Sequence, residues 1–200
     1  MKIRLLTAAA LLLAASTAPA IAQEKKPEAG GMDPKMMEAM MKAATPGEHH
    51  KHLDHLVGDW TYTLKLWMDP AQAPVESLGT MHAEWVLDGR YVQSVWKGDM
   101  MGMAFEGRGT DGYDNVAGKY FSSWIDNAGT GILLQTGDCD HAKKTCTLVG
   151  DTSDPMTGKK ITAKSVSSSP DKDNFKMEMY MKDGSGSELK SMEIVAKRKK

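Results

Sequence analysis

The stretch from Gly102 to Asn127 reads GMAFEGRGTDGYDNVAGKYFSSWIDN, and it decides the fold class. It has the pattern of two β-strands joined by a tight turn, and similar hairpins follow one another from Asp59 almost to the C-terminus. Consecutive strands and turns usually close into an up-and-down barrel or a sandwich, because closure removes the unpaired strand edges that would otherwise aggregate. The sequence therefore predicts a mainly β protein.

From Asp59 onward, apolar residues recur at every second position, which is typical of strands with one buried face. Three such faces run from Trp60 to Met68, from Met81 to Leu87 and from Phe175 to Met181. The turn signals are Asp88-Gly89, Lys97-Gly98-Asp99, Asp111-Gly112, Ala117-Gly118, Asn127-Ala128-Gly129, Pro170-Asp171 and Asp183-Gly184. The runs between turns number about ten. Since no room remains for crossover helices, we expect a barrel of antiparallel neighbours in sequence order.

The first 22 residues have the pattern of a secretory signal peptide. Lys2 and Arg4 precede an apolar run, and Ala20-Ile21-Ala22 is a small-x-small cleavage pattern. The apolar run is shorter than the roughly 20 residues that span a bilayer, and no later segment is long enough. We therefore expect a signal peptide at residues 1–22, no membrane span, and a soluble product in the periplasm or outside the cell.

Residues 23–32 are polar and rich in helix breakers, so we expect a flexible leader there. Two short helices are predicted within residues 33–58, packed on a barrel domain of residues 59–200. The first has Asp33 as a cap, Pro34 at its first position and a stripe of methionines from Met36 to Met41. The second starts at the capping box Thr45-Pro46-Gly47-Glu48.

The charge of the chain excludes a generally basic surface for nucleic acid. The whole chain has 25 Lys and Arg against 26 Asp and Glu. Without Lys2 and Arg4 the basic residues number 23, so the mature net charge is about −3. We expect no nucleic-acid partner.

The two cysteines, Cys139 and Cys146, flank a short polar segment. In an exported protein this spacing suits a disulfide across a hairpin, which contributes roughly 2–3 kcal/mol in the chain-entropy estimate. The alternative is a metal site in which both thiolates join His141 or Asp138, although the spacing matches no standard zinc pattern.

Histidines are densest between residues 49 and 55. On a helix, His49, His52 and His55 are spaced three apart, so their imidazoles can approach one face and take a transition metal. The alternative is a polar helix face next to the capping box. The group lacks the catalytic Glu of an H-E-x-x-H motif.

Methionine and tryptophan supply the candidate ligand contacts. The chain has 16 Met and five Trp. Paired methionines in a periplasmic protein suggest Cu(I) ligation, but their helical and strand spacing also suits a core or an adaptable pocket. An aromatic cavity with a few polar groups is a normal site for a small molecule. The candidate ligand-binding residues are Trp85, Trp96, Tyr113, Trp124, Met177 and Met179.

We find no catalytic constellation in the sequence and expect no cofactor. The segment Gly107 to Gly112 formally matches a dinucleotide fingerprint, but no helix follows to hold a pyrophosphate. The carboxylates Asp111, Asp114 and Asp126 all occur in turn-like contexts. These observations favour a protein that is not an enzyme.

Ordered motifs along most of the chain carry a resemblance to a known family. They are TPGEHHKHL (45–53), LVGDW (56–60), WMDP (67–70), LDGR (87–90), FEG (105–107), GYDN (112–115), WIDNAGTG (124–131), MY (179–180), MEI (192–194) and RK (198–199). In these motifs the chain resembles the bacterial domain-of-unknown-function family fifteen seventy-nine (DUF1579). The resemblance implies a lipocalin-like, calycin-type barrel and no established activity.

The leading hypothesis is therefore an exported barrel that binds a small, largely apolar molecule in its interior without chemistry. The first alternative is copper or zinc handling through the histidine or methionine clusters. The second is an enzyme acting in the barrel mouth through Asp114, Asp126 or Tyr113, which a buried carboxylate of raised pKa beside an open cavity would favour. The sequence leaves the oligomeric state open.

Overall fold

A computed structural model describes residues 32–182 and 186–200. The expected signal peptide, nearly all of the expected leader and the expected turn at Asp183-Gly184 lie outside the described residues.

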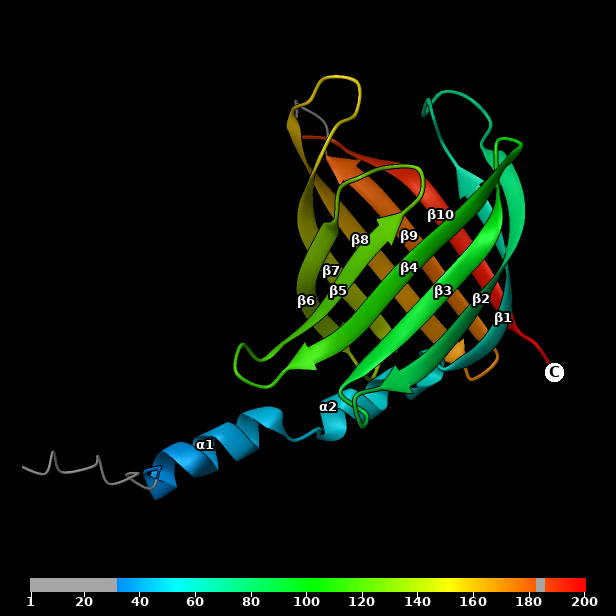
Figure 1. Ribbon diagram of the computed structural model, residues 1–200. Helices are drawn as coiled ribbons and strands as arrows, with labels where there is room; N and C mark the ends of the chain where they lie inside the picture. Colours follow the sequence, from blue (N-terminus) through cyan, green and yellow to red (C-terminus); the bar gives the residue numbers. More distant parts are fainter. Residues whose placement is uncertain (1–31, 183–185) are drawn as a thin grey trace, which may run out of the picture.

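Ten antiparallel strands form one closed barrel (Figure 1). They are β1 (Gly58–Leu66), β2 (Val75–Val86), β3 (Tyr91–Met100), β4 (Met103–Asp114), β5 (Lys119–Asp126), β6 (Leu133–Asp140), β7 (Thr145–Ser153), β8 (Lys160–Asp171), β9 (Asn174–Lys182) and β10 (Glu188–Arg198). Each strand pairs with its sequence neighbours, and β1 pairs with β10 to complete the ring. The predicted mainly β, ten-stranded up-and-down barrel is confirmed.

The core occupies the inside of the barrel, on the faces that the two-residue period marks. Trp60, Tyr62 and Leu64 are buried on β1, and the residues between them point outward. Met81 on β2 and Phe175 on β9 belong to the same buried cluster. The alternation therefore places the core correctly, because successive side chains of a strand point to opposite faces.

Glycine leaves room for the largest rings of the core. The Trp124 indole lies against Gly107 on the neighbouring strand, so that a Cβ at Gly107 would meet the Trp124 ring at 2.2 Å. Tyr62 covers Gly79 in the same way, and a Cβ there would also meet Tyr62 at 2.2 Å. These glycines let wide rings pack flat on the inner wall of the barrel.

Two of the predicted turns are strand interiors. Asp111-Gly112 lies within β4, and Lys97-Gly98-Asp99 lies within β3. The chain reverses instead at Met101 and Gly102, where both residues have positive φ values, 53° and 83°. Gly112 is needed in the strand because the Phe121 ring occupies the place of its side chain. The Asp-Gly pair therefore serves packing rather than chain reversal.

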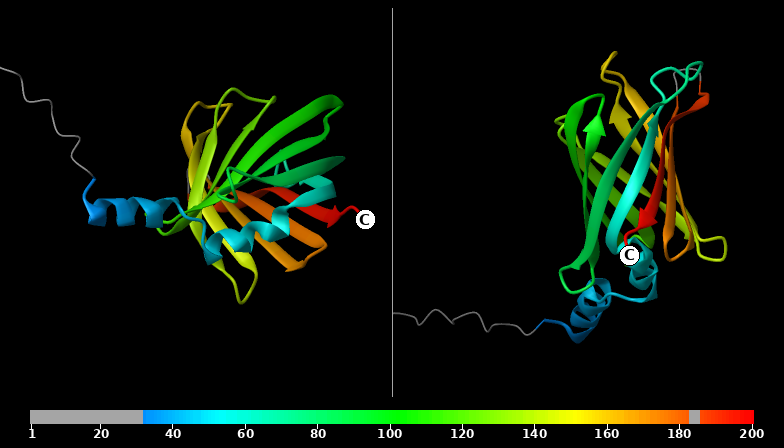
Figure 2. Two further views of the ribbon diagram at one scale, coloured as in Figure 1. Left: turned by 60° about the horizontal axis from the view of Figure 1, so that its bottom comes forward. Right: turned by 90° about the vertical axis from the view of Figure 1, so that its right-hand side faces the viewer.

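The helical segment before the barrel spans α1 (Pro34–Ala44), α2 (Glu48–Lys51) and the 3₁₀-helix η1 (His52–Leu56). The expected second helix is thus a single α-helical turn that continues as a 3₁₀-helix. Asp33 caps α1 as expected, since its carboxylate accepts the Lys35 N–H at 2.9 Å. No residue of α1 is buried, and α1 leads away from the barrel (Figures 1 and 2).

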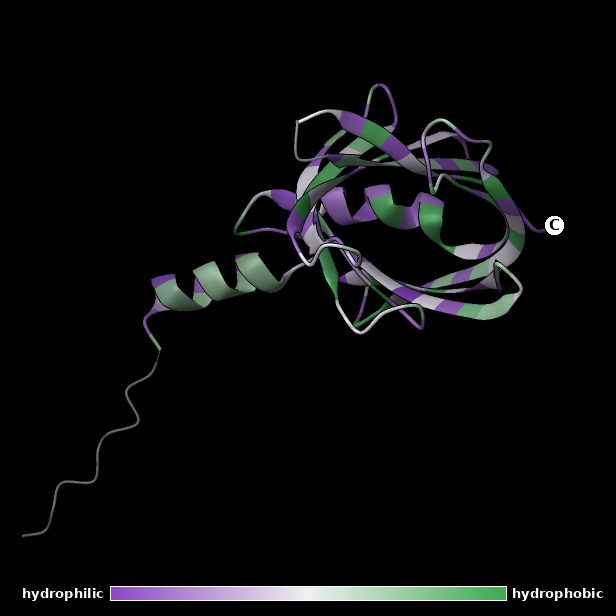
Figure 3. Ribbon diagram, turned by 90° about the horizontal axis from the view of Figure 1, so that it is seen from above, coloured by the Kyte–Doolittle hydropathy of each residue, from purple (hydrophilic) through white to green (hydrophobic). Residues whose placement is uncertain are grey.

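The α2–η1 segment lies across the lower opening of the barrel, where Figure 3 shows it within the ring of strands. Leu53 is buried against the core, and the Trp60 indole donates to the Leu56 carbonyl at 2.9 Å. The Arg198 guanidinium stacks over Trp60 and donates to the carbonyls of His55 and Val57. The end of β10 therefore ties η1 to the barrel. None of the helices in the described ranges is long and apolar enough to cross a membrane.

Candidate functional site

A cavity of about 120 Å³ lies inside the barrel beneath η1. Its apolar wall is made by Met81, Val92, Trp96, Trp124, Leu148, Phe175 and Met177. The Trp96 and Trp124 rings meet edge to face, with their centroids 5.9 Å apart. The two indoles thus form one aromatic side of the cavity.

Polar side chains from β4, β5, β6 and β8 form a belt in the wall of the same cavity. Asp111 on β4 lies opposite Ser122 on β5, and Ser122 lies opposite Gln135 on β6. The Ser165 hydroxyl of β8 donates to the Gln135 side-chain oxygen at 2.8 Å, and the Gln135 amide donates to the Ala163 carbonyl at 3.0 Å. All four belt side chains line the cavity. The cavity therefore combines aromatic rings with hydrogen-bonding side chains.

Asp111 is the acidic member of this belt. Burial raises the pKa of its carboxyl to about 6, and the hydrogen bond from Ser122 offsets part of that rise. Neither Lys nor Arg occurs among the described residues that line the cavity. The Asp111 carboxyl therefore changes charge near pH 6 without a neighbouring cation to balance it.

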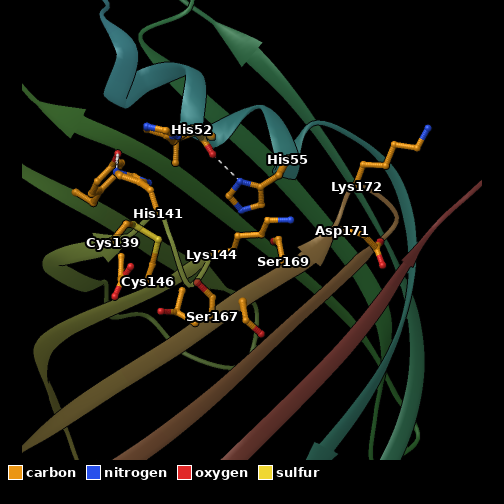
Figure 4. A pocket seen from close by; sticks show the side chains of 15 residues that line it. His52, His55, Cys139, His141, Lys144, Cys146, Ser167, Ser169, Asp171 and Lys172 are labelled. Atoms are coloured by element: carbon orange, nitrogen blue, oxygen red, sulfur yellow. Dashed lines mark hydrogen bonds between the residues drawn. A yellow bond between two sulfur atoms is a disulfide. The ribbon is translucent and has the colours of Figure 1, made fainter.

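A second cavity of about 370 Å³ lies at the barrel mouth, between η1 and the turns after β6 and β8 (Figure 4). Polar and charged side chains dominate its rim, including His52, His141, Lys144 and Asp171. The two cavities share the lining residues Leu53, His55, Tyr120, Cys139, Cys146 and Ser167. The mouth cavity therefore adjoins the interior one beside η1.

Imidazoles and phenols gather at this mouth. His52 stacks on His141 with centroids 3.6 Å apart, and His49 stacks on Tyr113 at 4.2 Å. The Tyr120 hydroxyl lies 3.2 Å from His49 Nδ1 and 3.3 Å from His141 Nε2. Burial, His52 and His49 lower the pKa of His141, in that order of importance. The His141 ring is therefore neutral at pH 7.

The predicted metal residues do not converge. His49 faces the Tyr113 ring, His52 faces His141, and His55 Nδ1 contacts the His52 carbonyl at 2.5 Å. Across residues 32–182 and 186–200, no group of three His, Cys, Asp or Glu side chains is placed to hold a metal ion.

Three of the six predicted ligand-binding residues line the interior cavity, namely Trp96, Trp124 and Met177. Trp85 donates its indole N–H to Asp54 of η1 at 2.8 Å, so it helps to hold the helical segment. Tyr113 joins the imidazole cluster. Met179 lies on β9 beyond Met177, and neither cavity includes it.

The predicted disulfide is confirmed. Cys139 and Cys146 are bonded to each other and face one another directly across β6 and β7. Neither sulfur is a free thiolate, so the alternative metal site based on both cysteines is wrong. The disulfide lies where the two cavities adjoin.

The other two carboxylates considered for catalysis, Asp114 and Asp126, accept local hydrogen bonds at the ends of β4 and β5. Asp114 accepts the N–H groups of Val116 and Ala117, and these bonds lower the pKa of its carboxyl. Asp126 accepts the indole N–H of Trp124 and the N–H of Ala128. Asp111, in contrast, is half-buried and lines the interior cavity, and its raised pKa is of the kind that acid–base chemistry uses.

Sequence reasoning missed the polar side of the site. Ser94, Ser122, Gln135 and Ser165 stand at alternate strand positions where an apolar residue is the usual choice. This departure from the apolar pattern is the signal in the sequence that could have revealed the polar residues of the cavity. It is weak, because a shift of one residue in the register would turn each of these side chains outward.

Comparisons with known proteins give structural likenesses and a family. The solved structure of Rv2717c from M. tuberculosis is similar with a TM-score of 0.53 at 14% identity, over 78% of this chain and 100% of that one, which shows a shared fold alone. A redesigned β-barrel has a TM-score of 0.40 at 14% identity, over 74% of this chain and 96% of that one. No curated protein matches the chain significantly. The profile of the family described as "Protein of unknown function (DUF1579)" matches residues 45–198. The chain belongs to the DUF1579 family.

Proposed function

We propose that this protein binds a small, largely apolar molecule inside the barrel without chemistry, in the manner of lipocalin-like, calycin-type barrels. The observation that carries the proposal is the pair of adjoining cavities, of which the interior one has a wall of indoles and thioethers. Apolar surface that leaves water on binding contributes roughly 25 cal/mol per Å². An aromatic cavity with few polar groups is therefore suited to an apolar ligand.

The cavity volumes limit the shape of the ligand. Small-molecule sites commonly have volumes of roughly 300–1,000 Å³. The mouth cavity of about 370 Å³ falls in that range, whereas the interior cavity of about 120 Å³ is smaller. A narrow molecule would place one end between Trp96 and the polar belt and leave the remainder beside η1.

Export is part of the proposal. A disulfide persists in oxidising compartments such as the periplasm. The Cys139–Cys146 bond supports a periplasmic or secreted location, as does the signal-peptide pattern of residues 1–22.

Native mass spectrometry of protein exported to the periplasm tests this function. We expect the wild type to carry a bound mass. Ser167 lines both cavities, so Ser167→Phe should remove that mass by blocking the passage between them. Thr147→Phe adds the same ring on the exposed face of β7 and should leave the mass in place. A wild type that stays empty and takes up no added n-octanol contradicts the proposal.

A second candidate is metal binding at the mouth. The Tyr120 hydroxyl lies within 3.3 Å of a ring nitrogen of both His49 and His141, so two imidazoles and a phenol meet there. Imidazole is a good ligand for copper and zinc.

Calorimetric titration with Zn²⁺ and Cu²⁺ tests the second candidate. We expect His49→Ala with His141→Ala to lower the affinity at least tenfold, while His82→Ala has no effect because His82 pairs with Asp59 outside the barrel. Equal heats for all three proteins would exclude a metal site at the mouth.

A further inference from the structure

We infer that the ligand of this barrel is an amine whose ammonium group binds the Asp111 carboxylate, with its apolar portion against Trp96 and Trp124. This inference rests on the proposed function and names the chemical class of the ligand.

The charge of the interior is the first argument. Among the described residues that line the interior cavity, Asp111 is the only carboxyl. The other titratable side chains there are His55 and Tyr120, and burial lowers the pKa of His55 and raises that of Tyr120 to about 12. Both are therefore neutral at pH 7 to 8, and neither supplies the missing positive charge. A half-buried carboxylate that lines an apolar cavity without a cation is unfavourable, and a bound ammonium would offset part of that cost.

The hydrogen bonds of the neighbouring groups are the second argument. The Trp96 indole donates to Ser94 at 3.0 Å, and the Gln135 amide donates to the Ala163 carbonyl at 3.0 Å. The Ser165 hydroxyl donates to Gln135. Each of these three donors in the cavity wall thus already has an acceptor within the barrel. The Asp111 carboxyl has Ser122 as its side-chain partner, and a carboxylate accepts about four hydrogen bonds.

The closeness of the Trp124 ring to the strand that carries Asp111 is the third argument. Gly109 precedes Asp111 on the inward face of β4, and a Cβ at Gly109 would lie 2.7 Å from the Ser94 hydroxyl and 3.6 Å from the Trp124 ring. The glycine therefore lets the Ser94 hydroxyl and the Trp124 ring lie close to the β4 backbone two positions before Asp111, and both Trp124 and Asp111 line the same cavity. A cation next to an indole face is attracted by the ring, and the apolar remainder of the molecule gains from the same surface.

A matched series of eight-carbon probes tests the inference. n-Octylamine, n-octanol and n-octanoate differ in head-group charge and share one tail. At pH 8, where the Asp111 carboxyl is ionised, we expect calorimetry and tryptophan fluorescence to show at least tenfold tighter binding of octylamine than of octanol. Octanoate should bind more weakly than octanol.

Two variants separate Asp111 from general electrostatics. Asp111→Asn should bring octylamine to within about threefold of octanol and leave octanol binding unchanged. Glu84→Gln removes one negative charge from the exposed face of β2 and should retain the preference for octylamine. Far-UV circular dichroism would verify that both variants fold.

Three outcomes would overturn the inference. Octanol that binds as tightly as octylamine would exclude amine recognition but leave the proposed apolar binding intact. A preference for octylamine that Asp111→Asn retains, or that Glu84→Gln also abolishes, would place the recognition elsewhere. If none of the three probes binds, the proposed function itself fails.

Discussion

At the residue scale, Asp111 is the clearest departure from what stability alone would select. Its carboxyl occupies an inward position of β4, where an apolar side chain would fill the cavity. Burial disfavours its charged form and raises its pKa from 3.8 to about 6. A polar group held at such a cost commonly marks a site of function.

Replacing Asp111 should reveal this cost through the pH dependence of stability. Because the folded-state pKa is raised, the contribution of this carboxyl is most favourable below pH 3.8 and is lost as the pH rises through about 6. Asp111→Asn should therefore increase the free energy of unfolding at pH 8, by at most about 3 kcal/mol. The gain should shrink toward zero near pH 4. Urea denaturation at both pH values measures it, with Glu84→Gln as the control; a gain independent of pH would contradict the assignment.

The sequence predicted residue positions well where their pattern is apolar. The alternation from Trp60 to Leu64 places those side chains inside the barrel, as the structure confirms. It did not place Asp111, because an Asp-Gly pair is also a common turn signal. Here the pair lies within a strand, and the Phe121 ring packs on Gly112. That tertiary contact cannot be read from the local sequence pattern.

At the element scale, charged side chains cross-link the outer faces of β9 and β10. The Lys190 ammonium contacts Glu178 at 2.7 Å and Glu193 at 2.5 Å, and Lys176 contacts the same two carboxylates at 3.0 and 3.3 Å. The hydrogen bonds from Lys190 and then Lys176 lower the pKa of Glu178 to about 2. The four charges alternate in sign, so they support the pairing of β9 with β10.

Removing one charge from this network should weaken the barrel at neutral pH. The pKa of Glu178 is depressed, so its contribution is present above pH 4.5 and is lost as the pH falls through about 2. Glu178→Gln should lower the free energy of unfolding by about 1 kcal/mol at pH 7. Denaturation in 1 M NaCl should reduce the difference, because salt screens the pairs. Equal stability of the two proteins at pH 7 in low salt would show that the pairs contribute nothing.

The disulfide should stabilise β6 and β7 mainly by restricting the unfolded chain. Cys139 and Cys146 are separated by seven positions, for which the chain-entropy estimate is roughly 2–3 kcal/mol. The double variant Cys139→Ser with Cys146→Ser should therefore unfold at a lower urea concentration than the oxidised wild type. Reduced wild type is the matched control, and it should resemble the variant. Indistinguishable midpoints for oxidised and reduced protein would refute the estimate.

At the scale of the whole molecule, the two ends of the helical segment differ in how they contact the barrel. Leu53 of η1 is 6% exposed and packs on the core, whereas Met40 of α1 is 53% exposed. The Asn115 side chain still holds α1 at its end, donating to the Thr45 carbonyl at 2.9 Å. The sequence could not distinguish these two helices, because the methionine stripe of α1 has the same helical spacing that a buried face would have.

Two alanine substitutions test that difference. Leu53→Ala should cost about 2–4 kcal/mol of stability, since it leaves a cavity between η1 and the barrel. Met40→Ala should change the free energy of unfolding by less than about 0.5 kcal/mol, because it alters a surface position. Urea denaturation of both variants measures this, and a large loss for Met40→Ala would mean that α1 is covered in solution.

The pairing of β1 with β10 also sets the order of events during biosynthesis. Trp60 lies opposite Arg198, so the first strand must wait for residues near position 198 before it gains its second neighbour. The other nine strands of the barrel are synthesised before β10, and the sheet that they form has two unpaired edges until β10 pairs with β1. Chaperones that recognise unpaired strand edges would have their longest opportunity on this chain before β10 closes the barrel.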